Sequence, residues 1–313
     1  MAKNSFVYNF NYQYRYFATF EQLLKDGNIT LSGQLTGFVF HLVKKLLSSF
    51  GISLIRKEKL DDLYSSLDKA NSKIKWMATP DKESINYFVQ NNCLNSESKS
   101  QLQQDLVALF VHSLFSNDPG YFVEFGATDG RSYSNTYSLE KSFRWSGILA
   151  EPATTWHRDL AINRSCEIDY RCVWSSDGES LLFNEVNEAE YSTVESFSNS
   201  DHHTALRRKG HSYFVQTVML ETLLREHEAP KVISYLSVDT EGSELEILQS
   251  FNFDAYKFNF ISVEHNYSEN RTKVHELLVQ NGYDRVLPSL SEWDDWYVRR
   301  CPETASFLEV ANA

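Results

Sequence analysis

The chain has 313 residues, a formal net charge of −12 at pH 7 and 14% aromatic residues, which is enough length for one large domain with an extension. The acidic balance excludes broad binding to a nucleic-acid backbone, so we expect no nucleic-acid partner, and the aromatic content excludes a disordered chain. Four cysteines without C-x-x-C spacing and a polar start without a signal segment predict a cytoplasmic protein with reduced thiols.

Residues 1–95 are expected to form a mainly helical N-terminal extension. Apolar side chains recur near residues 38–60, and residues 41–59 carry five Lys and Arg against one Glu, which predicts a basic amphipathic helix. No apolar run reaches the roughly 18 residues of a membrane span. Two interpretations stay open. The helix packs on the main domain or on a second subunit of a homo-oligomer, or it makes a peripheral contact with an anionic membrane surface.

The main domain is expected over residues 96–302. It begins with a predicted helix over 98–115, in which the apolar side chains fall on one face. A short apolar run at Tyr121–Phe125, preceded by a Pro-Gly pair, then predicts a buried central strand. Gly126 and Gly130 follow this strand, which indicates a tight turn that brings the backbone close to a ligand.

The turn after this strand suits a cationic ligand. It lacks the glycine spacing and the lysine of phosphate-binding loops, and Glu124 and Asp129 flank it instead. S-adenosylmethionine fits these acids, because it has an ammonium and a sulfonium but no phosphate. Glu151 ends the next predicted strand, at Gly147–Pro152, where an acid binds ribose hydroxyls in Rossmann-like folds. In the alternative interpretation, Glu124 and Asp129 only cap the turn.

The middle of the domain contains a predicted strand over 168–174, with Val173 as a candidate adenine contact, and an additional strand over 181–186. The polar stretch 191–213 has no clear period, which is typical of a binding loop or a lid. It contains the basic run 207–209, for which two interpretations stay open. The run binds an anionic acceptor such as a sugar phosphate or a nucleotide sugar, or it is an exposed charge run.

Acidic residues directly follow two further predicted strands. Ligands of open α/β sheets bind at the carboxyl ends of the strands, so these residues are expected close to the glycine turn. The strand over 232–238 is followed by Asp239 and Glu241, and the strand over 259–263 is followed by Glu264 and His265.

Three segments together resemble the FkbM family of S-adenosylmethionine-dependent methyltransferases. They are Phe122–Gly130 with Ser134-Asn135-Thr136, Gly147–Pro152, and the D-T-E-G-S-E block at Asp239–Glu244. The resemblance implies an α/β class I methyltransferase (Rossmann-like) fold with a mostly parallel seven-stranded sheet whose last strand is antiparallel. It also implies that the pair Gln104-Asp105 lines the cofactor pocket; in the alternative interpretation these are solvated residues of a first helical turn.

The residues and the resemblance together predict one set of cofactor contacts. They lie at the glycine turn, at the start of the helix that follows it, and at the ends of two strands. The predicted contacts are Glu124, Gly126, Ala127, Asp129, Gly130, Asn135, Glu151, Pro152 and Asp239.

Methyl transfer from S-adenosylmethionine requires an aligned acceptor oxygen and a group that takes its proton. His265 is the predicted base, because imidazole titrates near neutral pH. Asp239 or Glu264 takes this catalytic role instead or orients the acceptor. In an alternative interpretation, Asp239, Glu264 and His265 hold a divalent cation that lowers the pKa of the acceptor hydroxyl.

The sequence therefore predicts an S-adenosylmethionine-dependent O-methyltransferase that acts on a hydroxyl of a sugar, a glycan or a related metabolite, as in polysaccharide biosynthesis. The competing hypothesis is a non-catalytic scaffold with the methyltransferase fold, which binds a partner or a membrane through residues 1–95. Residues 303–313 are expected to form a short, frayed C-terminal tail.

Overall fold

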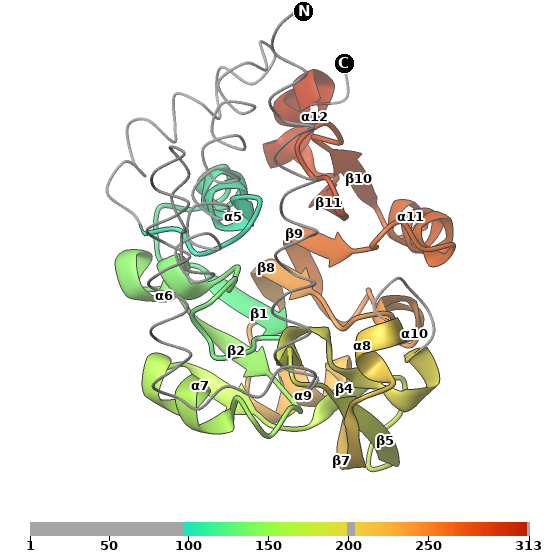
Figure 1. Ribbon diagram of the computed structural model, residues 1–313. Helices are drawn as coiled ribbons and strands as arrows, with labels where there is room; N and C mark the ends of the chain where they lie inside the picture. Colours follow the sequence, from blue (N-terminus) through green and yellow to red (C-terminus); the bar gives the residue numbers. More distant parts are fainter. Residues whose placement is uncertain (1–96, 199–203, 312–313) are drawn as a thin grey trace, which may run out of the picture. The chain divides into compact units, whose positions relative to one another are not determined.

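The computed structural model of the chain describes residues 97–198 and 204–311 (Figure 1). The predicted N-terminal extension and its amphipathic helix near 38–60 lie outside the described residues, so their membrane and subunit contacts stay predictions. Within the described residues, every helix is too short or too polar to traverse a lipid bilayer.

The main sheet has seven strands in the spatial order β10-β11-β9-β8-β1-β2-β3. Strand β11 pairs antiparallel with both of its neighbours, and the remaining pairs are parallel. This confirms the predicted class I methyltransferase sheet with its single reversed strand. The strands are β1 (Tyr121–Phe125), β2 (Ser146–Ala150), β3 (Glu167–Asp169), β8 (Val232–Val238), β9 (Lys257–Glu264), β10 (Tyr283–Val286) and β11 (Asp294–Arg299).

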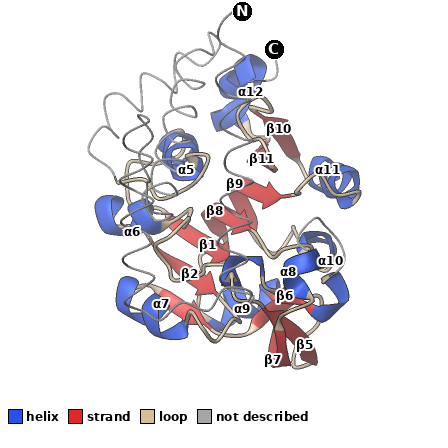
Figure 2. Ribbon diagram, viewed as in Figure 1, coloured by secondary structure: helices blue, strands red, loops and turns tan. Residues whose placement is uncertain are grey.

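Helices cover both faces of this sheet (Figure 2). Successive strand side chains point to opposite faces, so neighbours such as Phe122 and Val123 of β1 belong to two different apolar clusters. The cluster with Phe122 includes residues of α5 (Gln104–Ser113), α6 (Tyr137–Phe143), α7 (His157–Asn163) and α12 (Ala305–Ala311). The cluster with Val123 includes residues of α9 (Leu220–Glu226), α10 (Glu244–Gln249) and α11 (Asn270–Gln280).

A smaller sheet lies beside the main one, in the order β4-β7-β5-β6. Its strands are β4 (Cys172–Trp174), β5 (Ser180–Glu185), β6 (Thr193–Val194) and β7 (His211–Met219), and between them lie the 3-10 turns η2 (Ala189–Tyr191) and η3 (Glu195–Phe197) and the short α8 (Thr204–Arg207). The additional strand predicted over 181–186 is present as β5.

The single strand predicted over 168–174 is wrong, because the structure divides it between the two sheets. Residues before the break form β3 and those after it form β4. At the break, the Asp169 carboxylate accepts a hydrogen bond from the backbone N–H of Arg171 and pairs with its guanidinium. A carboxylate that binds the backbone two residues ahead stabilises a local turn, which ends the strand.

The expectation of a frayed C-terminal tail is also wrong. After the short turn η4 (Pro302–Thr304), α12 packs on the main domain. Leu308 and Ala311 are buried in the same cluster as α5, and the ring of Phe307 lies 5.3 Å from that of Phe110, edge to face. Sequence position alone did not reveal this packing, which supplies apolar contacts that a free tail would lack.

The packing of α12 predicts the effect of shortening one of its buried side chains. Leu308→Ala should lower the free energy of unfolding by about 2 kcal/mol, at the low end for leucine truncation because Leu308 is still 8% exposed. Urea titration measures the change. The exposed neighbour variant Glu309→Ala is the control and should change the same quantity by less than about 0.5 kcal/mol. Equal small effects in both variants would contradict the packing.

Candidate functional site

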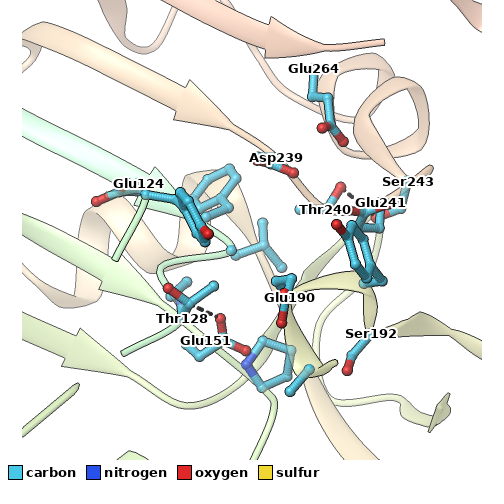
Figure 3. A pocket seen from close by; sticks show the side chains of 18 of the residues that line it. Glu124, Thr128, Glu151, Glu190, Ser192, Asp239, Thr240, Glu241, Ser243 and Glu264 are labelled. Atoms are coloured by element: carbon cyan, nitrogen blue, oxygen red, sulfur yellow. Dashed lines mark hydrogen bonds between the residues drawn. The ribbon is translucent and has the colours of Figure 1, made fainter. Parts of the chain in front are cut away.

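A cavity of about 430 Å³ opens at the carboxyl ends of β1, β2, β8 and β9 (Figure 3). Its volume lies within the range of small-molecule sites. In Figure 3, Thr128 and Glu151 lie at one end of the cavity, while Asp239 and Glu264 lie toward the other. Of the predicted site residues, Glu124, Gly126, Asn135, Glu151, Pro152, Asp239 and Glu264 line it, as does Val173.

The turn after β1 depends on the absence of a side chain at Gly126. Its φ is +70°, and a Cβ built there would lie 2.0 Å from the backbone carbonyl oxygen of Asp239. Gly126 therefore allows the end of β1 to pack directly against the end of β8. This contact joins the turn after β1 to the backbone of Asp239 at the end of β8.

Glu151 binds the same turn from the end of β2. One carboxylate oxygen accepts the backbone N–H of Thr128 and the other accepts that of Ala153, each at 2.8 Å. Burial raises the pKa of Glu151 to about 7, although the two backbone donors act in the opposite direction. Each carboxylate oxygen retains a further lone pair, so the group can still accept hydrogen bonds from a ligand.

Glu124 lines the cavity, but its carboxylate is occupied by the protein. It accepts hydrogen bonds from the Ser134 hydroxyl, the Asn135 backbone and the Thr136 hydroxyl. The guanidinium of Arg164 lies 3.7 Å away. The carboxylate is therefore held by groups of the loop, and its contact with a cationic cofactor stays a prediction.

Arg164 organises the loop between Gly126 and α6. Its side chain is fully buried and donates to Glu140, to the carbonyl of Gly130 and to the hydroxyls of Ser134 and Thr136. No periodicity or motif in the sequence singles out this arginine. A buried guanidinium that satisfies several loop oxygens at once fixes the backbone they belong to.

Three predicted cofactor contacts do not line the cavity: Ala127, Asp129 and Gly130. The carboxylate of Asp129 accepts hydrogen bonds from the backbone of Arg131 and from the backbone and hydroxyl of Ser132. It therefore caps the turn, which was the alternative interpretation. Gly130 faces the side chains of α7 and Arg164 instead of the cavity.

Three carboxylates gather at the ends of β8 and β9. One oxygen each from Asp239, Glu241 and Glu264 lies within 4.8 Å of the others. Asp239 and Glu264 hydrogen-bond to each other; burial and the nearby Asp294 raise the pKa of Asp239 to about 8. Burial and the charge of Asp239 also raise the pKa of Glu264. Two carboxyls this close cannot both ionise easily, so the pair retains a proton at neutral pH.

The geometry corrects the prediction for His265. The residue does not line the large cavity, and both ring nitrogens have partners within the protein. The Tyr267 backbone N–H donates to Nδ1 at 3.0 Å, so Nε2 carries the proton and donates to the Asp294 carbonyl, also at 3.0 Å. Burial lowers its pKa. His265 is a structural residue here and neither a base nor a metal ligand.

The metal hypothesis also changes. Among the described residues, one cluster of acidic side chains is close enough to share a metal ion. It consists of Asp239, Glu241 and Glu264, so it contains Glu241 and not His265. However, Glu241 already pairs with the Arg207 guanidinium at 2.8 Å, and Asp239 and Glu264 bond to each other. These contacts account for the charges of the group without a cation, so we assign no metal to it.

Several cavity residues were missed because they come from segments without a motif. Tyr191 and Ser192 belong to the irregular stretch 191–213, which the sequence predicted only as a binding loop or a lid, and Glu190 directly precedes it. The pair Gln104-Asp105 is fully buried and lines no cavity, so neither interpretation of it holds. Strained backbone is frequent at the rim, because five lining residues other than glycine have positive φ: Thr128, Tyr133, Glu241, Asn266 and Tyr267.

Alanine at Gly126 tests the contact between β1 and β8. Gly178 has the same φ of +70° but open space around it, so Gly178→Ala measures the backbone strain alone, about 1–2 kcal/mol. Gly126→Ala should lose roughly a further 1–3 kcal/mol of unfolding free energy, because the Asp239 carbonyl must move. Chemical denaturation of both variants gives the difference. Equal losses of unfolding free energy in the two variants would show that a side chain at Gly126 does not collide with the end of β8.

The raised pKa of Asp239 predicts a pH-dependent stability. Between the unfolded value of 3.8 and the folded value of about 8, the folded chain holds a proton that the unfolded chain has released, so rising pH favours unfolding. Asp239→Asn removes this effect. The difference in melting temperature, variant minus wild type, should therefore increase as the pH rises from 5 to 9. The exposed substitution Asp254→Asn is the control, and a pH-independent difference would contradict the burial of the Asp239 charge.

Comparison with known proteins identifies the family. A family model described as the methyltransferase FkbM domain matches residues 124–301, more than half of the chain. No curated protein matches the chain.

Three solved structures illustrate the structural similarity. Precorrin-6y C5,15-methyltransferase from Geobacter metallireducens GS-15 is 11% identical, with 63% of this chain and 89% of that chain covered and a TM-score of 0.33. Methyltransferase FkbM from Methylobacillus flagellatus KT is 11% identical, with coverages of 62% and 52% and a TM-score of 0.36. The plantazolicin methyltransferase BpumL in complex with SAH is 11% identical, with coverages of 82% and 90% and a TM-score of 0.33.

At these TM-scores the structural similarities add no argument of their own, and the assignment rests on the domain match and the residues it spans. The match begins at Glu124, at the glycine turn, and extends through the acidic strand ends to the last strand of the sheet. The chain belongs to the FkbM family of methyltransferases.

Proposed function

We propose that the protein is an S-adenosylmethionine-dependent O-methyltransferase that methylates a hydroxyl of a sugar or glycan. One observation carries the proposal. The cavity at the carboxyl edge of the sheet is lined by acids, hydroxyls and aromatic rings, and the described lining residues include no Lys, Arg or His. A cationic cofactor without phosphate suits such a lining, whereas the pyrophosphate of a nicotinamide dinucleotide does not.

Individual lining residues fit the parts of the cofactor. The Oδ1 atom of Asn135 is buried and has no hydrogen-bond donor among the described residues, so it can accept the cofactor ammonium. Glu151 can accept the ribose hydroxyls. Val173 and Phe183, with Pro152, give an apolar surface for the adenine ring.

The bound cofactor supplies an activated methyl group, so the protein has two tasks, to align the acceptor oxygen and to take its proton. Asp239 and Glu264 line the cavity and share a hydrogen bond, whereas His265 does not line it. We therefore assign the proton-accepting role to this carboxyl pair. A base with a pKa of about 8 suits chemistry near neutral pH, since it is strong enough to accept a proton and is partly ionised.

The competing scaffold hypothesis predicts that the acids of the cofactor site are lost. Glu151 and Asp239 instead lie in the lining of one cavity. No contact among the described residues favours the scaffold hypothesis, whose binding segment would be residues 1–95.

Isothermal titration tests the cofactor assignment. The wild type should bind S-adenosylmethionine and S-adenosylhomocysteine but not NAD. Glu151→Ala should weaken S-adenosylhomocysteine binding roughly 10- to 100-fold, because hydrogen bonds to a charged acceptor are lost. Glu179→Ala removes the same charge from an exposed site outside the cavity and should leave the affinity unchanged.

Two further results decide between the candidate functions. Absence of binding by either adenosyl compound would rule out the enzyme and favour the scaffold. If Glu151→Ala binds normally, the ribose contact is elsewhere. Binding followed by transfer of a labelled methyl group to a sugar hydroxyl, identified by mass spectrometry and NMR of the product, would support the O-methyltransferase.

A further inference from the structure

One wall of the cavity comes from the smaller sheet, which is an insertion relative to the main one. Glu190, Tyr191 and Ser192 line the cavity, together with Ala189 and Val194. Figure 3 shows Glu190 and Ser192 across the cavity from Glu124. We call residues 189–194 the insertion wall. It lies beside Glu241, in the segment that follows β8, because the Thr193 hydroxyl donates to the Glu241 carbonyl.

The insertion wall is fastened to the main domain by internal contacts. The Thr193 hydroxyl, which is fully buried, donates to the Glu241 carbonyl at 3.0 Å. The Arg207 guanidinium donates to the Tyr191 carbonyl at 2.9 Å and to the Glu241 carboxylate at 2.8 Å. The side chain of Arg207 is 0% exposed, and its charge is paired with Glu241 inside the protein.

This arrangement answers the question left open for the basic run 207–209. Arg207 pairs inward with Glu241, and Arg208 and Lys209 are exposed residues outside the cavity lining. None of the three therefore meets a ligand in the cavity. Within the described cavity, nothing therefore supports binding of an anionic acceptor by this run.

The charge of the lining can now be summed. Six acids line the cavity: Glu124, Glu151, Glu190, Asp239, Glu241 and Glu264. Arg164 lies beside Glu124 and Arg207 bonds Glu241, so two of the six are compensated. The other four have no cation beside them in the described lining. Asp239 and Glu264 share one proton, so this pair contributes one negative charge and not two. A phosphate that enters this cavity meets repulsion and finds no basic partner among these residues.

Building on the proposed function, we infer that the acceptor is a sugar without phosphate: the part that enters the cavity is an uncharged or amino-bearing sugar, not a sugar phosphate or a nucleotide sugar. Hydroxyl and ammonium groups donate hydrogen bonds to the carboxylates, and sugar rings pack on the aromatic side chains of Tyr191 and Trp293. Methylation then occurs on a free or polymerised sugar, after any phosphate or nucleotide carrier has left, or on a residue remote from it.

A matched panel of acceptors tests this inference. Glucose, galactose and mannose are compared with their 2-amino-2-deoxy forms, their 6-phosphates and their nucleotide diphosphate forms, with transfer of a labelled methyl group as the readout. For any sugar that is methylated, kcat/KM of the phosphorylated form should be at least about 100-fold lower than that of the parent sugar. The amino form should be at least as good as the parent.

The variant Glu190→Lys tests whether the insertion wall carries the discrimination. The quantity to compare is kcat/KM for the phosphorylated sugar divided by kcat/KM for the parent sugar. Glu190→Lys should raise this ratio at least about tenfold, because a charge that repels phosphate is replaced by one that attracts it. Glu190→Gln should have an intermediate ratio. Glu179→Lys makes the same charge change at an exposed residue outside the cavity and should leave the ratio unchanged. A structural effect alone would lower both rates and leave their ratio the same.

The possible failures are distinguishable. Preferred methylation of a sugar phosphate or nucleotide sugar would overturn the inference while the proposed function stands. Binding of S-adenosylhomocysteine without methylation of any sugar in the panel would overturn the sugar acceptor and this inference together. Absence of S-adenosylhomocysteine binding would overturn the cofactor assignment itself.

Discussion

The cofactor end of the cavity depends on the buried ion pair between Arg164 and the two carboxylates of Glu124 and Glu140. A charge that is removed from water is tolerated only when it is paired and its donors are satisfied, and Arg164 meets that requirement with loop oxygens as well as carboxylates. The loop that shapes the cavity is therefore fixed by charge compensation from α7. Glu124 belongs to the support of the site, although its position at a strand end suggested a ligand contact.

The two ends of the cavity differ in how their buried carboxylates are compensated. At the turn, each acid has a donor from the protein: Glu124 from the loop and Glu151 from two backbone amides. At the ends of β8 and β9, Asp239 and Glu264 have mainly each other. A group that shares a proton with its neighbour is ready to exchange that proton, whereas a group held by several fixed donors is not. In the proposed function, the acids at the turn therefore hold the loop and the cofactor, and Asp239 and Glu264 exchange the proton.

The sequence was sufficient for the central strands of the main sheet and for the edge at which their acids gather, because β8 and its neighbours are apolar runs with clear ends. It did not predict the break after β3. The sequence was insufficient wherever the same side chain can bind either a ligand or another group of the protein. Asp129 could bind a ligand or cap its own turn, and only the local backbone decides between them. His265 at a strand end resembled a base until its two nitrogens found backbone partners. Arg207 looked like surface charge, because no pattern encodes a pairing with Glu241, 34 positions away.

The close contact between Gly126 and the Asp239 carbonyl has a thermodynamic consequence. Because the turn and the end of β8 share this contact, neither can shift without the other. In the proposed function, a cofactor that shifts the turn would also shift the backbone of Asp239, the proposed proton acceptor. Linkage then requires reciprocity: whatever factor the cofactor applies to acceptor affinity, the acceptor applies to cofactor affinity. The coupling between the two affinities would therefore pass through this backbone contact.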